Sequence, residues 1–316
     1  MSEKKIIAVV GATGAQGGGL VRAILGDATS EFSVRALTRN PQSDNAKALA
    51  DAGADVVAAD MDNPASIRQA FDGAHGAFCV TAFWEHFSPE KEVAQAGAMA
   101  QAAKDAGLQH VIWSTLEDTR KFIPLDDDRM PTLMEQYKVP HFDGKGEADQ
   151  AFRDLGVPTT FLLTSAYFEN MIYFGMGPKK SDDGKYAVTL PMGDQKLPWI
   201  AVEDIGKCAY GIFKEGAKHI DQTVGIAGEH LTGEELAAGL SRALGVEVAY
   251  NAVEPEVYRG FGFPGADDLG NMFQFNRDFS DDFCAARNVE VARALNQELQ
   301  DLDAWLASNK DRIPLD

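Results

Sequence analysis

The sequence contains 316 residues, of which 45% are hydrophobic and 24% are charged, and its formal net charge is −19. This much apolar material can bury a core without disulfides or a structural metal, which excludes disordered, collagen-like and disulfide-stapled classes. The surplus of acidic residues argues against direct binding to nucleic acid or to an anionic membrane, because phosphate contacts need clustered Lys and Arg.

The three cysteines, Cys79, Cys208 and Cys284, are widely spaced and form no C-x-x-C or Cys/His cluster of metal-binding spacing. This usage predicts no metal site and a reducing compartment. The apolar run at 6–10 is too short for a signal peptide, and no stretch approaches the about 20 apolar residues that cross a bilayer. We therefore expect a cytoplasmic protein that does not enter a membrane.

Short apolar runs alternate with helical patterns over the first half of the chain. The predicted strands are 5–10, 34–38, 55–59, 77–81 and 110–114, and the predicted helices between them are 16–25, 45–52, 64–71 and 89–106. Asn63 and Ser88 precede Pro in a first turn and indicate helix starts, whereas Gly53 and Gly107 indicate helix ends. This alternation predicts βαβ units and a parallel sheet with right-handed crossovers.

The regular alternation of strands and helices ends in the second half of the chain. After a predicted helix at 141–155 and a strand at 159–163, we expect an irregular β segment at 184–193, a helix at 202–214, a strand at 223–227 and mostly helices from 232 onward. The predicted fold is α/β, a doubly wound parallel sheet (Rossmann) with a smaller, discontinuous, mostly helical C-terminal substrate lobe. The predicted division is 1–163 plus about 200–228 for the nucleotide-binding domain, and about 164–199 plus 229–316 for the substrate or partner lobe.

A glycine-rich loop follows the first predicted strand and opens a helix. Its G-x-x-G-x-x-G spacing is typical of short-chain dehydrogenase relatives. Glycine permits a tight turn and close approach of a pyrophosphate, and the helix N-terminus offers unpaired N–H groups. The alternative is a tight βα turn that binds no ligand. The residues predicted to hold the pyrophosphate are Gly11, Thr13, Gly14, Ala15, Gln16 and Gly17.

The end of the second predicted strand bears on the choice of cofactor. NAD-binding folds carry an acidic residue about 20 positions after the glycine loop, where it holds the ribose hydroxyl. The corresponding window, 37–40, contains no acid and instead has Arg39, whose planar guanidinium suits a 2′-phosphate. The sequence therefore favours NADP(H) over NAD(H), the alternative being a solvated surface arginine.

The next two strand ends supply further candidate contacts to the cofactor. Asp60 and Met61 follow the third strand and are predicted to reach the adenine, although Asp60 could instead serve only the turn. Thr81, Ala82 and Phe83 follow the fourth strand and are predicted to lie beneath the ribose and nicotinamide. For this segment the alternative is an aromatic pair that closes the core.

The predicted catalytic positions depart from the usual short-chain reductase pattern. That pattern has Ser or Thr after the fifth strand and Tyr-x-x-x-Lys on the next helix, where Tyr donates a proton and Lys lowers its pKa. Here Ser114 and Thr115 fill the first position, and His141 stands in place of tyrosine, four residues before Lys145. This spacing puts His141 and Lys145 on one helix face, so both are candidate catalytic residues, the alternative for His141 being a structural role.

Two other tyrosines are candidate proton donors. Tyr210 and Lys214 form a true Tyr-x-x-x-Lys but lie far down the chain, so we interpret this match as a coincidence. Tyr137 has its lysine at the wrong spacing and is kept only as a reserve proton donor.

Taken together, these motifs resemble the NmrA-like family of atypical short-chain dehydrogenases, and within it the animal NADPH-sensing branch. The resemblance runs over nearly the whole chain and rests on residues 11–17, 37–41, 80–85, 141–147, 167–170 and 262–267. It implies that NADP(H) is bound by the loop, with Arg39 at the 2′-phosphate and Lys145 near the nicotinamide ribose. It also implies that Tyr167, Phe168 and Asn170 lie beside the nicotinamide.

The sequence departs from the family pattern in two segments. Ala82-Phe83 stands where a polar–aromatic pair is expected, and 124–129 is an acidic run that resembles an insertion. Members of the family divide into redox-responsive regulators that bind partner proteins and reductases of quinones or aromatic compounds. The absent tyrosine is similar to the regulator branch, so we expect an NADP(H)-responsive regulator or sensor with a protein partner. The alternative is an NADPH-dependent reductase of a small quinone-like or aromatic substrate, and the sequence leaves open whether the chain is a monomer or a homodimer.

Overall fold

The computed structural model describes residues 3–181 and 184–315, and these divide into two units. Unit 1 contains the residues up to Asp118, Gly144–Leu163 and Glu203–Val224; unit 2 contains Thr119–Asp143, Thr164–Val202 and the residues from Gly225 on. Unit 2 therefore includes the segment 119–143, which the predicted division assigns to the nucleotide-binding domain.

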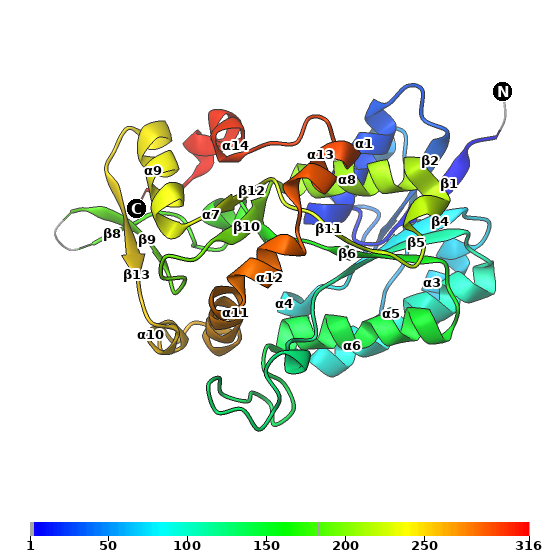
Figure 1. Ribbon diagram of the computed structural model, residues 1–316. Helices are drawn as coiled ribbons and strands as arrows, with labels where there is room; N and C mark the ends of the chain where they lie inside the picture. Colours follow the sequence, from blue (N-terminus) through cyan, green and yellow to red (C-terminus); the bar gives the residue numbers. More distant parts are fainter. Residues whose placement is uncertain (1–2, 182–183, 316) are drawn as a thin grey trace. The chain divides into compact units, whose positions relative to one another are not determined.

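Unit 1 is built on a mainly parallel sheet, which confirms the predicted fold class (Figure 1). Within the described residues it has seven strands in the order β11-β6-β5-β4-β1-β2-β3. Their bounds are β1 (Lys5–Val9), β2 (Phe32–Thr38), β3 (Asp55–Ala58), β4 (Gly76–Cys79), β5 (His110–Thr115), β6 (Thr159–Leu163) and β11 (Thr223–Gly225). Every pairing from β1 to β6 is parallel, and the inner strands β4 to β6 are buried along their whole length, as parallel sheets covered on both faces require.

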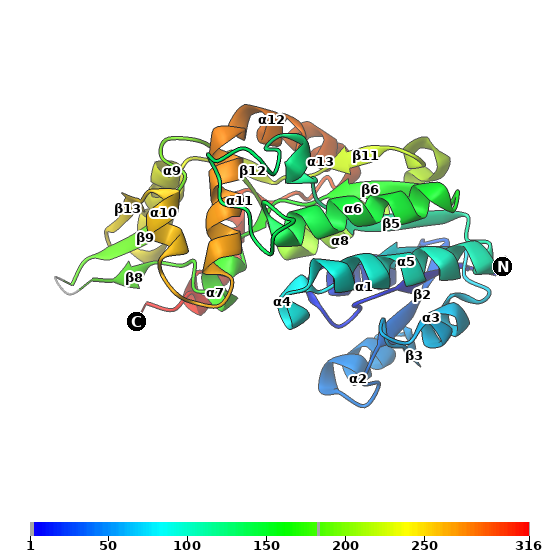
Figure 2. The same cartoon turned by 90° about the horizontal axis from the view of Figure 1, so that it is seen from below.

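Helices cover both faces of this sheet (Figures 1 and 2). One face carries α1 (Ala15–Gly26) and α8 (Val202–Glu215), and the other carries α3 (Pro64–Phe71), α5 (Pro89–Ala106) and α6 (Pro140–Asp154). The core beneath the second group includes Ile67, Phe71, Met99 and a stacked pair of Trp113 and Phe152. The shorter helices of unit 1 are α2 (Asp44–Asp51), α4 (Phe83–His86) and η2 (Gly216–His219).

Unit 2 contains two smaller sheets in addition to the expected helices. Within the described residues, one joins β12 (Glu229–Leu231), β10 (Leu197–Ile200) and β7 (Ala166–Tyr167), and the other joins β13 (Val248–Ala252), β9 (Tyr186–Leu190) and β8 (Lys179–Lys180). Its helices are η1 (Thr119–Lys121), α7 (Asn170–Tyr173), α9 (Gly233–Leu244), α10 (Pro255–Arg259), α11 (Ala266–Asp278), α12 (Ser280–Ala285), α13 (Val289–Leu295), α14 (Leu302–Asn309) and η3 (Lys310–Arg312). The described helices include none that is long and apolar enough to cross a membrane.

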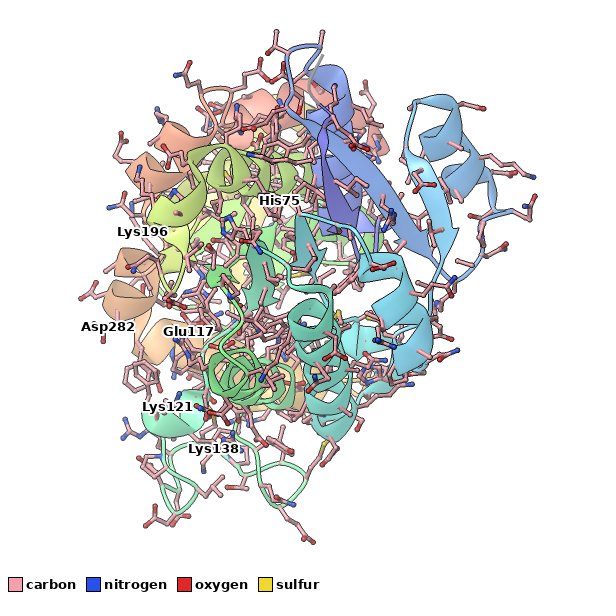
Figure 3. All side chains as sticks on the ribbon, turned by 90° about the vertical axis from the view of Figure 1, so that its right-hand side faces the viewer. His75, Glu117, Lys121, Lys138, Lys196 and Asp282 are labelled. Atoms are coloured by element: carbon pink, nitrogen blue, oxygen red, sulfur yellow. The ribbon has the colours of Figure 1, made fainter. Side chains whose placement is uncertain are left out.

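The segment between η1 and α6 is fixed to α11 within unit 2. Lys138, labelled in Figure 3, is almost fully buried, and its ammonium donates to the carbonyl oxygens of Asp127 and Met130, both at 2.8 Å. The amide of Asn271 on α11 donates to the carbonyl of Lys138 at 2.6 Å and to that of Pro131 at 2.9 Å. These bonds compensate buried polar groups of a long loop and explain why it belongs to this unit.

A buried histidine in β5 makes the stability of the fold depend on pH. His110 is 3% exposed, and its Nε2 lies 2.8 Å from the hydroxyl of Thr160. Because that hydroxyl donates its proton to the carbonyl of His219, Nε2–H of His110 is the donor in this contact. Burial, and to a smaller extent the nearby His219 and His75, lowers the pKa of His110 from 6.5 to about 4.

We therefore predict that the free energy of unfolding falls as the pH drops from 6.5 towards 4. In this window the unfolded chain protonates His110 and the folded chain does not, so the unfolded state binds more protons. The full effect is about 3 kcal/mol. Urea unfolding across this pH range should show a shallower slope for His110→Gln than for wild type. His75→Gln, at a less buried ring (labelled in Figure 3), should remove less of the slope, and equal slopes for wild type and His110→Gln would contradict the assignment.

Candidate functional site

The glycine-rich loop has the backbone that an anion-binding turn requires. Gly11 adopts a positive φ of 65°, and the amide of Gly14 donates to its carbonyl at 2.9 Å. A Cβ on Gly17 would lie 2.5 Å from the carbonyl oxygen of Gly11, so only glycine fits there. Helix α1 starts at Ala15 with no side-chain cap from Gly14 and no acidic residue in its first turn. The loop and helix terminus therefore offer backbone N–H groups that fit a pyrophosphate.

The strand order brings the other candidate residues of unit 1 to the same edge of the sheet. The sheet order reverses between β1 and β4, and ligands of open α/β sheets bind outside the carboxyl ends of strands at such a point. Arg39 directly follows β2, and Asp60 and Thr81 each lie two residues beyond the ends of β3 and β4. Because these strands are parallel, all three residues lie at the edge where the glycine loop leaves β1.

Arg39 forms a two-bond contact with Glu85 of α4. Its Nη1 lies 2.9 Å from Oε2 of Glu85, and its Nη2 donates to Oε1 at 3.0 Å. The side chains are 63% and 52% exposed, so this ion pair lies at the surface. Arg39 is thus a surface arginine within reach of ligands, and its contact with a 2′-phosphate stays a prediction.

Asp60 and Met61 both have structural contacts within unit 1. An oxygen of the Asp60 carboxylate accepts from the amide of Asp62 at 3.0 Å, which is the turn role left open from the sequence. Met61 packs against the core beneath α3 and α5. The contact with adenine that the sequence predicts for Asp60 and Met61 stays a prediction.

The most constrained polar group of the site is a buried carboxylate on α5. Glu92 is fully buried and accepts a hydrogen bond from the hydroxyl of Thr81 at 2.5 Å. The ammonium of Lys145 lies 2.8 Å from the same carboxylate and donates to the Thr81 hydroxyl oxygen at 2.6 Å. This ammonium also lies 5.4 Å from the centre of the Trp113 ring, within the range of a cation–π contact. Thr81 and Lys145, predicted separately to approach the ribose, are therefore brought together, and Glu92 is what joins them.

Sequence reasoning missed Glu92, although a signal was present. As an acidic residue in the first turn after the Ser88 cap, it has an ordinary explanation in the helix dipole. However, it shares helical spacing with Ala96 and Met99, which are buried. An acid on the buried face of a helix requires a partner, but the spacing does not say which residue that partner is.

We predict that Glu92 and Lys145 are energetically coupled. Glu92→Gln and Lys145→Met each leave one buried charge without its counterpart, and each should lower the free energy of unfolding by about 3–5 kcal/mol. The double variant leaves neither charge buried without its partner. Its loss of unfolding free energy should therefore be smaller than the sum of the two single losses by about 1–3 kcal/mol.

Chemical denaturation of the four proteins in this cycle measures the coupling. Glu90→Gln, on the exposed side of the same helix, is the matched control and should change stability by less than about 0.5 kcal/mol. Additive losses in the double variant would show that the pair is not coupled.

The other candidates near the fourth and fifth strands pack within unit 1. Ala82 precedes α4, whose first residue, Phe83, is 3% exposed. The rings of Phe83 and Trp84 pack edge to face with their centres 5.3 Å apart, as expected for an aromatic pair that closes the core. The hydroxyl of Thr115 donates to the carboxylate of Asp149 at 2.6 Å, and Ser114 is buried. Thr115 is therefore bound by a structural acceptor at the position where reductases have a catalytic hydroxyl.

The rejected Tyr-x-x-x-Lys lies at the wrong end of α1. The hydroxyl of Tyr210 donates to Asp27 at 2.8 Å, and Lys214 lies 4.5 Å from its ring centre. Asp27 follows the last residue of α1, whereas the glycine loop precedes the first. Desolvation raises the pKa of Tyr210, so its hydroxyl stays protonated as the donor to Asp27.

His141 lies in the first turn of α6, in the part of the helix that belongs to unit 2. Its Nδ1 is 2.7 Å from Oδ1 of Asp268, and its amide donates to the other oxygen of that carboxylate at 3.2 Å. Both side chains are buried. Asp268 thus holds the ring and the helix start together, which is the structural role left open for His141. The reserve donor Tyr137 is also buried in unit 2, at 4% exposure.

Asp143, two residues after His141, organises the turn before α6. Its carboxylate accepts from the amides of Thr119, Lys138 and Val139 and from the hydroxyl of Thr119. Burial raises the pKa of Asp143, and these hydrogen bonds oppose that rise. Four donors to one carboxylate mark a structural group, so Asp143 adds no general acid to the site.

The three residues predicted beside the nicotinamide belong to unit 2. Phe168 is fully buried and stacks on Trp199 with ring centres 6.0 Å apart, so its side chain is a core element. Tyr167 ends β7, and Asn170 starts α7 with its carbonyl accepting from the amide of Phe174.

Among the described residues, no group of three or more His, Cys, Asp or Glu is placed to hold a metal ion.

Comparisons with known proteins show what the chain is similar to. The model of the NmrA-like family matches residues 3–306. An NmrA-like family domain-containing oxidoreductase of Malbranchea aurantiaca is 28% identical over 261 residues, which cover 78% of this chain and 75% of that protein. An NmrA-like family domain-containing protein of Dictyostelium discoideum is 30% identical over 263 residues, which cover 81% and 82%.

Solved structures show the same fold. The crystal structure of NmrA, a negative transcriptional regulator, in complex with NADP has a TM-score of 0.77 and 25% sequence identity, covering 97% of this chain and 95% of that one. The same regulator has also been solved in complex with NAD.

Proposed function

Because the chain belongs to the NmrA-like family, we propose that it binds NADP(H) through unit 1 and acts as a redox-responsive regulator. One observation carries the second part: the groups at the usual catalytic positions are engaged in structural hydrogen bonds. His141 replaces the tyrosine and is held by Asp268, and Thr115 is held by Asp149. A regulator needs neither group as a proton donor, whereas a carbonyl reductase needs one.

The residues of unit 1 fit the successive parts of the dinucleotide. The N–H groups at Ala15–Gly17 would hold the pyrophosphate, Arg39 the 2′-phosphate and Lys145 a ribose hydroxyl. When bound, NADP(H) supplies the two-electron redox chemistry. The buried Glu92 and Thr81 orient the Lys145 ammonium and limit its freedom. The crystal structure of the regulator NmrA in complex with NADP supports this assignment. The resemblance to the animal sensor branch stays a prediction.

A second candidate function is an NADPH-dependent reductase of quinone-like or aromatic acceptors. It is favoured by the Malbranchea relative, which is named an oxidoreductase. Quinones demand less of an enzymatic acid than aliphatic ketones do, so the structural role of His141 does not by itself prevent their reduction. The two candidates agree on the cofactor and differ in turnover and in the need for a partner protein.

We predict that Arg39→Ala weakens NADPH binding about tenfold to a hundredfold, because it removes a charge-assisted contact worth about 1.5–3 kcal/mol. NADH binding should be nearly unchanged, since NADH has no 2′-phosphate. Calorimetric titration of both cofactors measures the two dissociation constants. Arg68→Ala on α3, which removes a similarly exposed guanidinium, is the matched control and should affect neither. Equal losses for both cofactors in Arg39→Ala would remove Arg39 from the 2′-phosphate site.

The regulator and the reductase are separated by turnover and by hydrogen exchange. For a regulator, wild type and Lys145→Ala should show the same background rate of NADPH oxidation with every quinone tried. NADPH should nevertheless slow amide exchange in the loop at 11–17, because a signalling ligand must bind one conformation better than another. Saturable quinone reduction that Lys145→Ala abolishes would establish the reductase instead.

A further inference from the structure

The ion pair between Arg39 and Glu85 occupies the edge of the guanidinium that a phosphate would need. Nη1 and Nη2 of Arg39 face Oε2 and Oε1 of Glu85 at 2.9 and 3.0 Å, the parallel two-bond arrangement that arginine also forms with phosphates. A 2′-phosphate that uses this edge must therefore displace the carboxylate or share the guanidinium with it. Both side chains are more than half exposed, so the pair is weak enough for a stronger anion to displace it.

Glu85 reaches Arg39 from a separate segment of unit 1. It lies in α4, which follows β4, whereas Arg39 follows β2, and β1 lies between these two strands in the sheet. The neighbour of Glu85, His86, accepts the amide proton of Ser88 at Nδ1, which fixes the end of α4. The carboxylate is thus presented by a fixed short helix beside the loop of β1.

We propose that Glu85 is the residue that sets the selectivity between NADPH and NADH, an inference that rests on the proposed binding of NADP(H) by unit 1. A 2′-phosphate carries a charge of about −1.5 to −2 at neutral pH and is repelled by the carboxylate with which it competes for Arg39. The 2′-hydroxyl of NADH is neutral and can donate a hydrogen bond to a carboxylate. Glu85 therefore lowers the preference for NADPH that Arg39 alone would give.

Glu85→Gln tests this inference because it removes the charge and keeps the size of the side chain. The dissociation constants of NADPH and NADH are measured by calorimetry on the full chain, and the readout is their ratio. The preference for NADPH should rise about three- to tenfold, through tighter binding of NADPH. This gain should shrink at raised ionic strength, since exposed charges are screened.

Two controls keep the result specific. Glu90→Gln removes the same charge five residues further on, at a side chain that accepts from Ser88, and should leave the ratio unchanged. In the Arg39→Ala background, Glu85→Gln should give a smaller gain than in wild type, because no guanidinium is left to release. An equal gain from Glu90→Gln would reduce the effect to net charge and overturn the proposal.

The remaining outcomes distinguish this inference from the function on which it rests. A ratio that Glu85→Gln leaves unchanged, in a protein that binds NADPH, overturns the role of Glu85 alone. A fall in the preference for NADPH means that Glu85 positions Arg39 for the phosphate, which also overturns it. If wild type binds neither cofactor, the proposed function fails and the inference fails with it.

Discussion

The buried carboxylate of Glu92 is the constraint on which the site in unit 1 depends. An ionised carboxylate removed from water is unfavourable by several kcal/mol unless charge and hydrogen bonds compensate it. Here the compensation comes from Thr81 beyond β4 and from Lys145 on α6, with Glu92 itself on α5. Three elements of the unit therefore meet at one charge, and the ammonium of Lys145 has a defined position before any ligand arrives.

The short helix α4 extends this constraint towards the predicted 2′-phosphate contact. Two adjacent residues of α4 contact different parts of the candidate site: Glu85 binds Arg39, and Nε2 of His86 lies 3.4 Å from Oε1 of Glu92. Since Nδ1 of His86 accepts from the amide of Ser88, the ring proton is carried by Nε2. The side chains of α4 thus approach both the arginine after β2 and the carboxylate that binds the lysine on α6, within unit 1.

The sequence predicted the sheet of unit 1 well and unit 2 less well, for physical reasons. Strands β1 to β6 are apolar runs set off by glycine and helix-capping residues, so their pattern is local. By contrast, β13 pairs with β9 about sixty residues earlier, and a five-residue strand with three solvent-exposed positions gives no local signal. The loop before α6 belongs to unit 2 because of Lys138 and Asn271, whose bonds no periodicity reveals.

The residues of the candidate site were likewise predictable from the sequence only in part. The glycine loop and Arg39 could be identified from spacing, since their chemistry depends on neighbours in sequence. The partners that decide the chemistry of Lys145, His141 and Arg39 are Glu92, Asp268 and Glu85, which lie 46 to 127 residues away in sequence, and none could be assigned from sequence alone.

The most direct measurement of the central claim is a crystal structure of the protein grown with NADPH. We expect the pyrophosphate on the amides of Ala15–Gly17, the 2′-phosphate on Arg39, and a ribose hydroxyl within hydrogen-bond distance of Lys145 Nζ while Glu92 still holds that ammonium. A nucleotide bound away from the carboxyl edge of the sheet, or one whose ribose does not contact Lys145, would contradict the claim.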